Sequence, residues 1–358
     1  MEKTKTLINE LVTVPGLSGY EDQVRKYLHH RWKALTEEQS TSRLGSLHAL
    51  KKGTGPEPRH SILIATHMDT IGMMVTAVES GLLRITQIGG IDNRTLPGLT
   101  VNVHTKDKIL PGVIILPPAH TLPESQHKAT VEMDNLRVDV GLMPKDVEKK
   151  VEIGDQVTFA LEPQDLGDGY FTSPGLDNRA CVAILTETLE LLQTRLHQWD
   201  VWAVATVQEE VGLKGAKTSG FALRPDLALV MDVTFGSGPG APSHETLEMD
   251  KGPSFDLGPS THPRLYQAFV DYAEAQEISF HRYGYPRGSG TDADSLQLAA
   301  EGIPTMVVSL PLRYMHTPVE VIQLRDIQRI ARLVAGFIES LDEKFMDTLK
   351  WDDESEAD

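Results

Sequence analysis

The sequence predicts an α/β fold, in which a mostly parallel sheet carries helices on both faces and a small β-barrel-like domain is inserted into the chain. Strand-like apolar runs alternate with helical patterns before residue 70 and after residue 167, which is typical of parallel sheets. Between these parts, short β-type runs are separated by glycine, proline and aspartate. Several predicted strands also end in histidine or carboxylate residues, which places candidate functional side chains at one edge of the sheet.

Length and composition describe a globular protein with a large core. The chain has 358 residues, of which 40% are apolar and 24% charged. Its net charge of -17 argues against nucleic-acid and anionic-membrane partners. The single cysteine, Cys181, excludes an internal disulfide framework and a cysteine-rich zinc site. With neither a signal-peptide core nor an apolar run of ~18 residues, we expect a cytoplasmic protein.

The first 70 residues predict two amphipathic helices followed by two strands. The helices cover Lys5–Val14 and Tyr20–Ala34, with Pro15-Gly16-Leu17-Ser18-Gly19 between them. The strands cover Leu44–Lys51 and His60–Thr66, and the second leads into His67 and Asp69.

Residues 71–166 form the expected all-β insertion. The predicted strands are Met73–Val78, Leu82–Ile88, Thr100–Val103, Val113–Ile115, Arg137–Val140 and Gln156–Phe159, with one short helix at Pro144–Lys150. His104, His120 and His127 lie here without metal-ligand spacing, and we interpret them as surface or structural residues. The flanking residues 1–70 and 167–358 then make one discontinuous catalytic domain.

The second half of the chain resumes the α/β alternation. The predicted strands are Val201–Val207, Leu227–Met231, Leu247–Asp250, Ser279–Tyr283 and Thr305–Leu310. The predicted helices are Ala180–Arg195, His262–Glu277, a helix opened by Gly288–Asp292 and running to about Ala300, and Ile322–Leu341. The acidic tail from Asp352 to Asp358 has the composition of a disordered segment.

Two adjacent carboxylates, Glu209 and Glu210, follow the apolar strand Val201–Val207. Carboxylates at a strand end are costly to desolvate unless they bind a cation or handle a proton. Four other residues occupy comparable positions, at or just beyond a strand end: His67, Asp177, Asp232 and His316. With Glu210 they make two histidines and three carboxylates, a donor set that suits zinc, cobalt or manganese.

Five ligands are too many for one tetrahedral ion, whereas two ions ~3.5–4 Å apart that share a bridging carboxylate would use them all. Successive side chains of an extended segment point to opposite sides, so one of Glu209 and Glu210 can be a ligand while the other faces a metal-bound water. Asp69, two residues after His67, can accept the other ring N–H of that histidine. Taken singly, each residue also has an ordinary structural explanation, such as a solvated glutamate pair or a helix cap at Asp177.

The motifs together resemble the tetrahedral, or TET-like, metallo-aminopeptidases, a family that includes glutamyl and deblocking aminopeptidases and members labelled cellulase M. The matching stretches run in family order along nearly the whole chain: Pro15–Glu21, Ala65–Asp69, Leu176–Ala180, Gln208–Gly212, Met231–Val233, Gly290–Ala293 and His316–Glu320. One departure is Asn178, where the family usually has a second aspartate; it retains the shape and loses a charge.

The resemblance implies a zinc-exopeptidase-like fold and a role for each residue. Asp177 would bridge two divalent ions per subunit, zinc or cobalt ahead of manganese. His67 and Asp232 would complete one site, and Glu210 and His316 the other. The catalytic residues would be Glu209, as general base, and Asp69, which would orient His67.

The resemblance also implies a homo-oligomer built from dimers, up to a dodecamer, in which the insertion serves assembly and access. The insertion lies between His67 and Asp177, whereas the related aminoacylase and carboxypeptidase families carry their extra domain after the glutamate pair. The expected activity is therefore removal of N-terminal residues from peptides.

Two other functions stay open from the sequence. A glycosidase of the endoglucanase type needs two carboxylates flanking a sugar bond, and it explains neither histidine. A catalytically inactive metal-binding scaffold should have lost ligands, and none is visibly lost. The preferred first residue stays open too, although Arg282, Arg287 and Arg313 slightly favour acidic over aliphatic residues.

Overall fold

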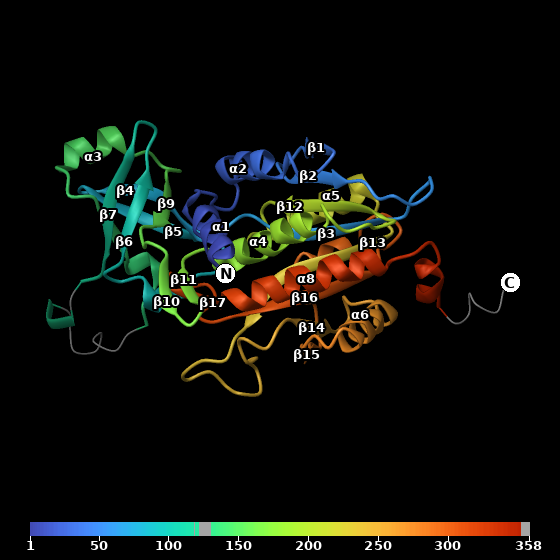
Figure 1. Cartoon of the computed structure of the whole chain (residues 1–358). Helices are drawn as coiled ribbons and strands as arrows, with labels where there is room; N and C mark the ends of the chain where they lie inside the picture. The colour runs from blue at the N-terminus through green and yellow to red at the C-terminus, as the bar shows by residue number, and fades with distance from the viewer. Residues whose placement is uncertain (118, 122–129, 352–358) are drawn as a thin grey trace.

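The computed structural model describes residues 1–117, 119–121 and 130–351. A mixed sheet with its helices forms the larger part of the molecule, and a β-barrel lies at one end (Figure 1). The acidic tail and His127 lie outside the described residues. Within the described residues, no helix combines the length and the apolarity that crossing a bilayer requires.

An eight-stranded sheet forms the centre of the α/β part. Its strands, in spatial order, are β1 (Glu38–Thr41), β2 (Leu47–Lys51), β12 (Asp200–Thr206), β3 (Ser61–His67), β13 (Leu227–Phe235), β16 (Thr305–Leu312), β14 (Ser254–Leu257) and β15 (His281–Gly284). The central strands β12, β3, β13 and β16 are mutually parallel, while β2 and β14 join them antiparallel. The carboxyl ends of the four central strands therefore meet at one edge.

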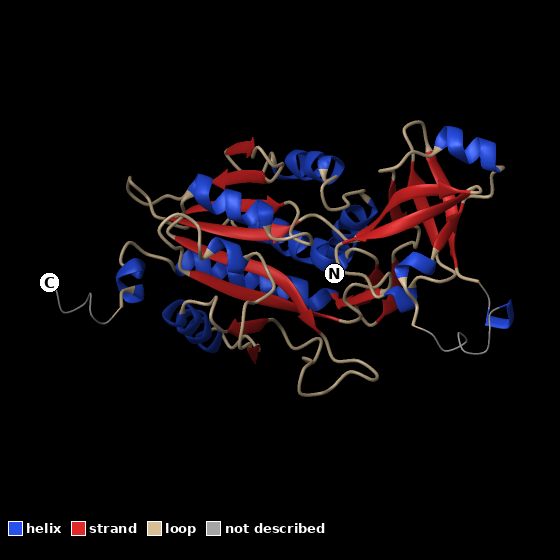
Figure 2. Ribbon diagram, turned by 180° about the vertical axis from the view of Figure 1, so that it is seen from behind, coloured by secondary structure: helices blue, strands red, loops and turns tan. Residues whose placement is uncertain are grey.

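Helices cover both faces of this sheet, as predicted (Figure 2). One face packs against α1 (Glu2–Thr13), α2 (Asp22–Trp32), α4 (Leu176–Leu191), α6 (Pro263–Ala275) and α8 (Leu324–Ser340). The other packs against α5 (Lys214–Leu223) and α7 (Ala293–Leu296). In β3, Ile62 and Ile64 enter the first core while Leu63 and Ala65 enter the second, as expected for a strand that is apolar on both faces.

The insertion forms a closed barrel, which agrees with the predicted all-β structure. Around the barrel the strands are β4 (Gly72–Glu79), β5 (Leu82–Ile88), β8 (Arg137–Asp139), β7 (Ile109–Ile115), β6 (Thr100–His104) and β9 (Gln156–Phe159), with helix α3 at Pro144–Lys150. A separate apolar core fills it. A three-stranded sheet of β10 (Gln164–Gly167), β11 (Tyr170–Ser173) and β17 (Glu320–Gln323) follows the barrel. Short 3-10 turns occur at Asn93–Thr95, Ala119–Thr121, Met133–Asn135 and Phe345–Leu349.

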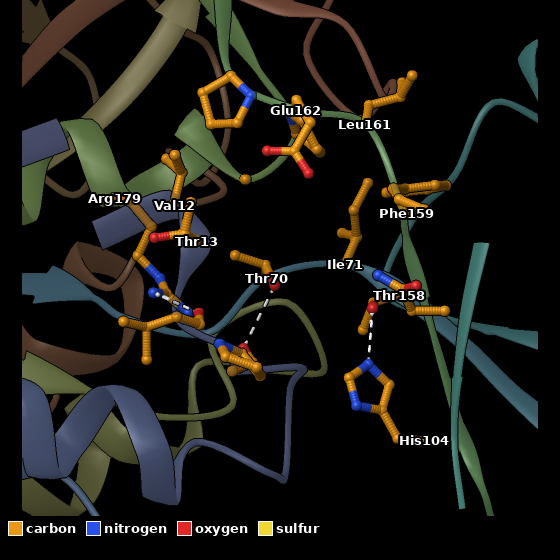
Figure 3. Close-up of a pocket in the computed structure, with 18 of the residues that line it drawn as sticks. Val12, Thr13, Thr70, Ile71, His104, Thr158, Phe159, Leu161, Glu162 and Arg179 are labelled. Carbon is orange, nitrogen blue, oxygen red and sulfur yellow. Dashed lines mark hydrogen bonds between the residues drawn. The ribbon is translucent and has the colours of Figure 1, made fainter. Parts of the chain in front are cut away.

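A cavity of about 260 Å³ lies where the barrel meets the α/β part (Figure 3). The connection between α1 and α2 forms one wall, and the segment after β9 forms another. Thr70 and Arg179 lie in the same wall as that connection, so the segment between α1 and α2 reaches the residues next to Asp69 and Asp177.

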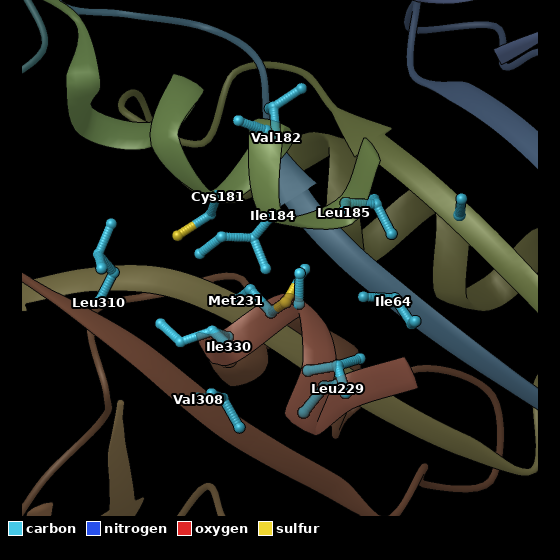
Figure 4. Close-up of a cluster of buried hydrophobic side chains, with 14 of the residues drawn as sticks. Ile64, Cys181, Val182, Ile184, Leu185, Leu229, Met231, Val308, Leu310 and Ile330 are labelled. Atoms are coloured by element: carbon cyan, nitrogen blue, oxygen red, sulfur yellow. The ribbon is translucent and has the colours of Figure 1, made fainter. Parts of the chain in front are cut away.

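Behind the carboxyl edge, the core is continuous from the sheet to α4 and α8 (Figure 4). The fully buried Cys181 belongs to the same core cluster as Met231 of β13, Val308 of β16 and Ile330 of α8. Cys181 is thus the packed side chain that its position in a helix predicts. Burial raises the pKa of its thiol well above the ordinary value.

Several predicted elements differ from the observed ones. The strand expected at Leu227–Met231 continues to Phe235, because β16 pairs with it over its full length; Asp232 is therefore inside a strand and not at its end. The segment 247–250 forms no strand: Leu247 makes only an isolated bridge with Gly236. The helix expected to run to about Ala300 is limited to Ala293–Leu296. Asp294 accepts the N–H groups of Ser289 and Gly290 and holds the preceding segment as a loop, and Ala300 has a φ of +53°, which is not helical. The sequence did not reveal β1, α5, β14, β10, β11 or β17.

Candidate metal centre

The five predicted ligands converge at the carboxyl edge of the sheet. His67 ends β3, Glu210 follows β12, Asp232 lies in β13 and His316 follows β16. Asp177 lies at the start of α4, where the backbone is not yet helical. Parallel strands bring their ends to the same edge, so residues far apart in the sequence become neighbours.

Asp177 lies between the two histidines. Its Oδ1 is 3.2 Å from Nε2 of His67, and its Oδ2 is 3.4 Å from Nε2 of His316. Asp232 Oδ1 lies 3.6 Å from His67 Nε2, and Glu210 Oε2 lies 3.5 Å from His316 Nε2. The donors thus fall into two three-residue groups that share Asp177, and within each group they lie within 4.8 Å of one another.

Glu209 lies beside both groups without belonging to either. Its Oε2 is 3.9 Å from Nε2 of His67, and its side chain is 9% exposed. His67, Glu209 and Glu210 make a third cluster of potential ligand atoms. This placement separates the two glutamates: Glu210 faces His316, and Glu209 faces the space next to His67.

Asp69 contacts His67 differently from the prediction. Nδ1 of His67 is 3.1 Å from the main-chain carbonyl oxygen of Asp69 and 3.7 Å from its carboxylate Oδ1. The carbonyl is therefore the closer acceptor for that ring nitrogen. The Asp69 carboxylate instead accepts the main-chain N–H groups of Glu209 and Glu210, at 3.1 and 3.2 Å.

Glu320 was not predicted to contribute, although it ends the matched stretch His316–Glu320. It is 1% exposed. Its Oε2 accepts the N–H of Asp177 and its Oε1 accepts the N–H of His316, both at 3.1 Å. One carboxylate thus connects the backbones of two predicted ligands. Only its position in that stretch could have indicated this, because nothing local distinguishes Glu320 from a solvated glutamate.

Burial dominates the electrostatics of the cluster. It raises the pKa of Glu209 to about 10 and, with the nearby charge of Asp177, that of Glu210 to about 9. Burial also raises the pKa of Asp232. For Asp177 burial acts in the same direction, but hydrogen bonds from His316 and His67 outweigh it and lower the pKa below the ordinary range. The cluster therefore favours bound cations or bound protons.

The donor set could hold divalent metal ions. Among the described residues, only histidines lie within ion-pair distance of Asp177, Glu209, Glu210 and Asp232. Buried carboxylates without a lysine or arginine partner are costly unless a metal or a proton compensates them. Imidazole and carboxylate donors suit zinc, cobalt or manganese.

Other candidate residues have structural partners. Asn178 Nδ2 donates to the carbonyl of Met231 at 2.9 Å, a bond that an ionised aspartate could not make. His104 bonds the hydroxyl of Thr158, as expected of a structural histidine. Arg282, on edge strand β15, pairs with Glu274, so it is not a free cation at the centre.

The fold and this donor cluster define an α/β protein with a buried group of histidines and carboxylates, able to bind metal, at the carboxyl edge of its sheet. More specifically, the family model described as M42 glutamyl aminopeptidase matches residues 45–333, and the chain belongs to this family. The lysyl aminopeptidase of Pyrococcus furiosus is 34% identical over 340 residues, which cover 94% of this chain and 96% of that relative.

Solved structures of peptidases also resemble this chain along most of its length. The aminopeptidase APDkam598 of Desulfurococcus kamchatkensis is 34% identical and superimposes with a TM-score of 0.91 over 98% of each chain. The TET1 peptidase of Pyrococcus horikoshii, which can assemble into a tetrahedron or a large octahedral shell, is 29% identical with a TM-score of 0.82. The superposition covers 94% of this chain and 100% of the TET1 chain. Family and relatives together support aminopeptidase activity for this chain.

Proposed function

We propose that the chain is a binuclear-metal aminopeptidase that hydrolyses the first peptide bond of its substrates. One observation supports this most directly: the two oxygens of Asp177 each face a different histidine, at 3.2 and 3.4 Å, which suits a carboxylate shared by two ions. His67 and Asp232 would complete one ion's ligands, and Glu210 and His316 the other's.

Glu209 is the proposed general base. It lies beside both ligand groups, and burial holds its pKa far above that of a solvated glutamate. Divalent ions bound here would polarise the scissile carbonyl and acidify the attacking water, and their charge would favour ionised Glu209. The Glu209 carboxylate then accepts a proton from water and delivers it to the leaving amine. The free α-amine of the substrate approaches a ligand carboxylate, which excludes N-terminally blocked peptides.

The inserted barrel is proposed to act in assembly and substrate access. We divide the chain into a catalytic part, residues 1–70 and 167–358, and an insertion, residues 71–166. The proposed assembly is a homo-oligomer built from dimers, up to a dodecamer, and similar proteins that form a dodecamer, a tetrahedron or an octahedral shell support oligomerisation. Light scattering of the purified protein tests this, and a monomer at working concentration would contradict it. The single buried cysteine is consistent with the proposed cytoplasmic location.

The substrate panel and the metal can be tested together. The enzyme is stripped with a chelator, restored with zinc, cobalt or manganese, and assayed on aminoacyl anilides with acidic, basic and aliphatic first residues. We expect activity to vanish on chelation and to return with zinc or cobalt. The family description favours glutamyl substrates and the Pyrococcus relative favours lysyl ones, so the rank order decides the preference.

The same stripped and restored samples, assayed on cellulose as well, separate the alternatives. If the enzyme still hydrolysed all the anilides after complete removal of metal, the proposal would be contradicted. Cellulose hydrolysis insensitive to chelation would support the glycosidase. Absence of bound ions after reconstitution would support the inactive scaffold.

A further inference from the structure

The segment between α1 and α2 lies directly against Thr70, which follows His67 and Asp69 in the chain. Thr70 N donates to the carbonyl of Gly16 at 3.0 Å, and Ser18 N donates to the carbonyl of Thr70 at 3.1 Å. The Thr70 hydroxyl also bonds the Gly16 carbonyl, as Figure 3 shows. This segment is thereby paired with the chain that carries His67 and Asp69.

Residues 208–210, here called the glutamate turn, follow β12. Two buried carboxylates accept the three successive main-chain N–H groups of this turn. Gln208 N donates to Oε1 of Glu21 at 3.1 Å. Glu209 N and Glu210 N donate to Oδ1 and Oδ2 of Asp69. All three donors belong to the turn that aims both glutamate side chains, so the acceptors fix its orientation.

The backbone of this turn requires such support. Gln208 has a φ of +56°, in the left-handed region that residues other than glycine seldom adopt. Backbone conformations of this kind persist only where the surroundings hold them. The Gln208 N–H bond to Glu21 is therefore a direct restraint on a strained residue next to Glu209.

Ser18 and Glu21 are placed to hold this arrangement together. The Ser18 hydroxyl donates to Oδ2 of Asp69 at 2.8 Å, and Glu21 Oε1 also accepts the N–H of Gly19 at 2.7 Å. Ser18 and Glu21 are 4% and 5% exposed, so water cannot readily replace these bonds. Each residue thus couples the segment between α1 and α2 to the turn.

The same segment is also tied to α4. Buried Arg179 donates from Nη1 to the carbonyls of Leu11 and Val14, at the end of α1. Gly16 packs closely beside it, since a Cβ there would collide with Nη2 of Arg179. Burial lowers the pKa of Arg179 to about 10, a shift that nearby Asp69 and Glu21 oppose. The segment therefore lies between the helix of Asp177 and the glutamate turn.

We propose that Glu21 and Ser18 are positioning residues for the reaction: together with Asp69 they hold the main chain of residues 208–210, and thereby aim Glu209 and Glu210. This inference rests on the proposed function, in which Glu209 is the base and Glu210 a ligand. Neither residue touches the reacting atoms. Their contribution is to keep the two side chains in place.

The test uses the full-length protein with Glu21→Ala, Glu21→Gln and Ser18→Ala. Glutamine retains an oxygen acceptor for the N–H groups of Gln208 and Gly19, whereas alanine removes it. For Glu21→Ala we expect kcat to fall by about 10- to 100-fold, because small misplacements of catalytic groups are costly. KM should change less than about threefold, since the substrate contacts are untouched. Glu21→Gln should keep most of the activity, and Ser18→Ala should show a smaller loss.

Hydrogen exchange gives a readout that does not depend on turnover. In Glu21→Ala, a peptide covering residues 204–213 should exchange about tenfold faster or more, because a hydrogen bond to a charged acceptor is lost. Glu21→Gln should stay near wild type. Asp226→Ala is the matched control: Asp226 accepts the main-chain N–H of Ser61 at 2.7 Å, at the opposite edge of the sheet. The Asp226→Ala variant should leave both the hydrogen exchange of residues 204–213 and kcat unchanged.

The outcomes separate this inference from the proposed function. Exchange at 204–213 that is unchanged in both Glu21→Ala and Ser18→Ala would overturn the positioning role, whatever the activity. So would equal kcat losses in Glu21→Ala and Asp226→Ala, since the effect would then be general destabilisation. A wild-type enzyme without metal-dependent peptide hydrolysis, combined with faster exchange in Glu21→Ala, would refute the proposed function and leave the restraint on the turn intact.

Discussion

The carboxylates at the two edges of the central sheet have different kinds of partner. At the amino edge, Asp200 accepts hydrogen bonds from Arg59 and from the N–H of Gly53, at 2.7 and 2.8 Å. Asp226 there contacts Nδ1 of His60 at 3.0 Å and accepts the N–H of Ser61. At the carboxyl edge, among the described residues, only histidine side chains lie within ion-pair distance of the ligand carboxylates.

The difference indicates which edge serves stability and which serves function. Paired carboxylates at the amino edge connect the beginnings of neighbouring strands. Clustered carboxylates at the carboxyl edge raise one another's pKa values and oppose folding unless a cation or proton joins them. Substitutions at the carboxyl edge should therefore change activity and metal binding, and those at the amino edge should change stability alone.

The largest expected effect comes from substituting the two adjacent glutamates, Glu209 and Glu210, one at a time. Glu209→Gln should lower kcat/KM by about 10²- to 10⁴-fold, the range for loss of a general base, while both ions remain bound. Glu210→Ala should lose one ion from the group with Asp177 and His316, and with it the activity. Steady-state kinetics with metal analysis of the same samples measures both. Unchanged hydrolysis by well-folded Glu209→Gln would refute its role as base.

A second prediction concerns stability against pH with and without metal. In the metal-free protein, burial raises the pKa values of Glu209 and Glu210 to about 10 and 9, above those of the unfolded chain. At these two groups the folded state therefore binds more protons between about pH 4.5 and 9, so their contribution to stability is greatest at low pH and is lost as pH rises through this window. One proton of difference corresponds to about 1.4 kcal/mol per pH unit.

Metal should reverse this slope, because bound cations take the place of protons on the ligands. Denaturant unfolding of stripped and reconstituted protein at several pH values measures both slopes. Parallel slopes in the two forms would show that the cluster does not bind the ions. Glu210→Gln is the control in the stripped form, since it should flatten the fall between about pH 4.5 and 9.

The sequence predicted the positions of site residues correctly where these residues follow regular strands. Parallel strands end at one edge, so His67 after β3 and Glu210 after β12 could be expected to meet, although metal binding itself stays a prediction. Asp232 was assigned to a strand end because the apolar run stops at Met231, yet pairing with β16 continues the strand. Tertiary pairing of this kind leaves no local pattern.

The supporting residues were harder to predict, because they act through main-chain N–H groups. Glu320 and Glu21 accept such groups from segments more than a hundred residues away in the sequence. Nothing in their own neighbourhoods shows which N–H groups they will meet. Asp69 is an intermediate case: its proximity to His67 followed from spacing, whereas its carboxylate contacts with the glutamate turn did not.

The smallest expected effect lies at the amino edge. Asp226→Ala removes the acceptor for the Ser61 N–H and the partner of His60, at the point where β3 and β13 begin. The Asp226 side chain is 34% exposed, so water replaces part of what is lost, and we expect the free energy of unfolding to fall by about 1 kcal/mol. Denaturant melts measure this, and Asp226→Asn, which keeps an oxygen acceptor, should lose less. Since no ligand of the candidate metal centre touches Asp226, kcat/KM and metal content should match wild type. A large activity loss at unchanged stability would mean that the amino edge also shapes the active site, and the division of roles between the two edges would be wrong.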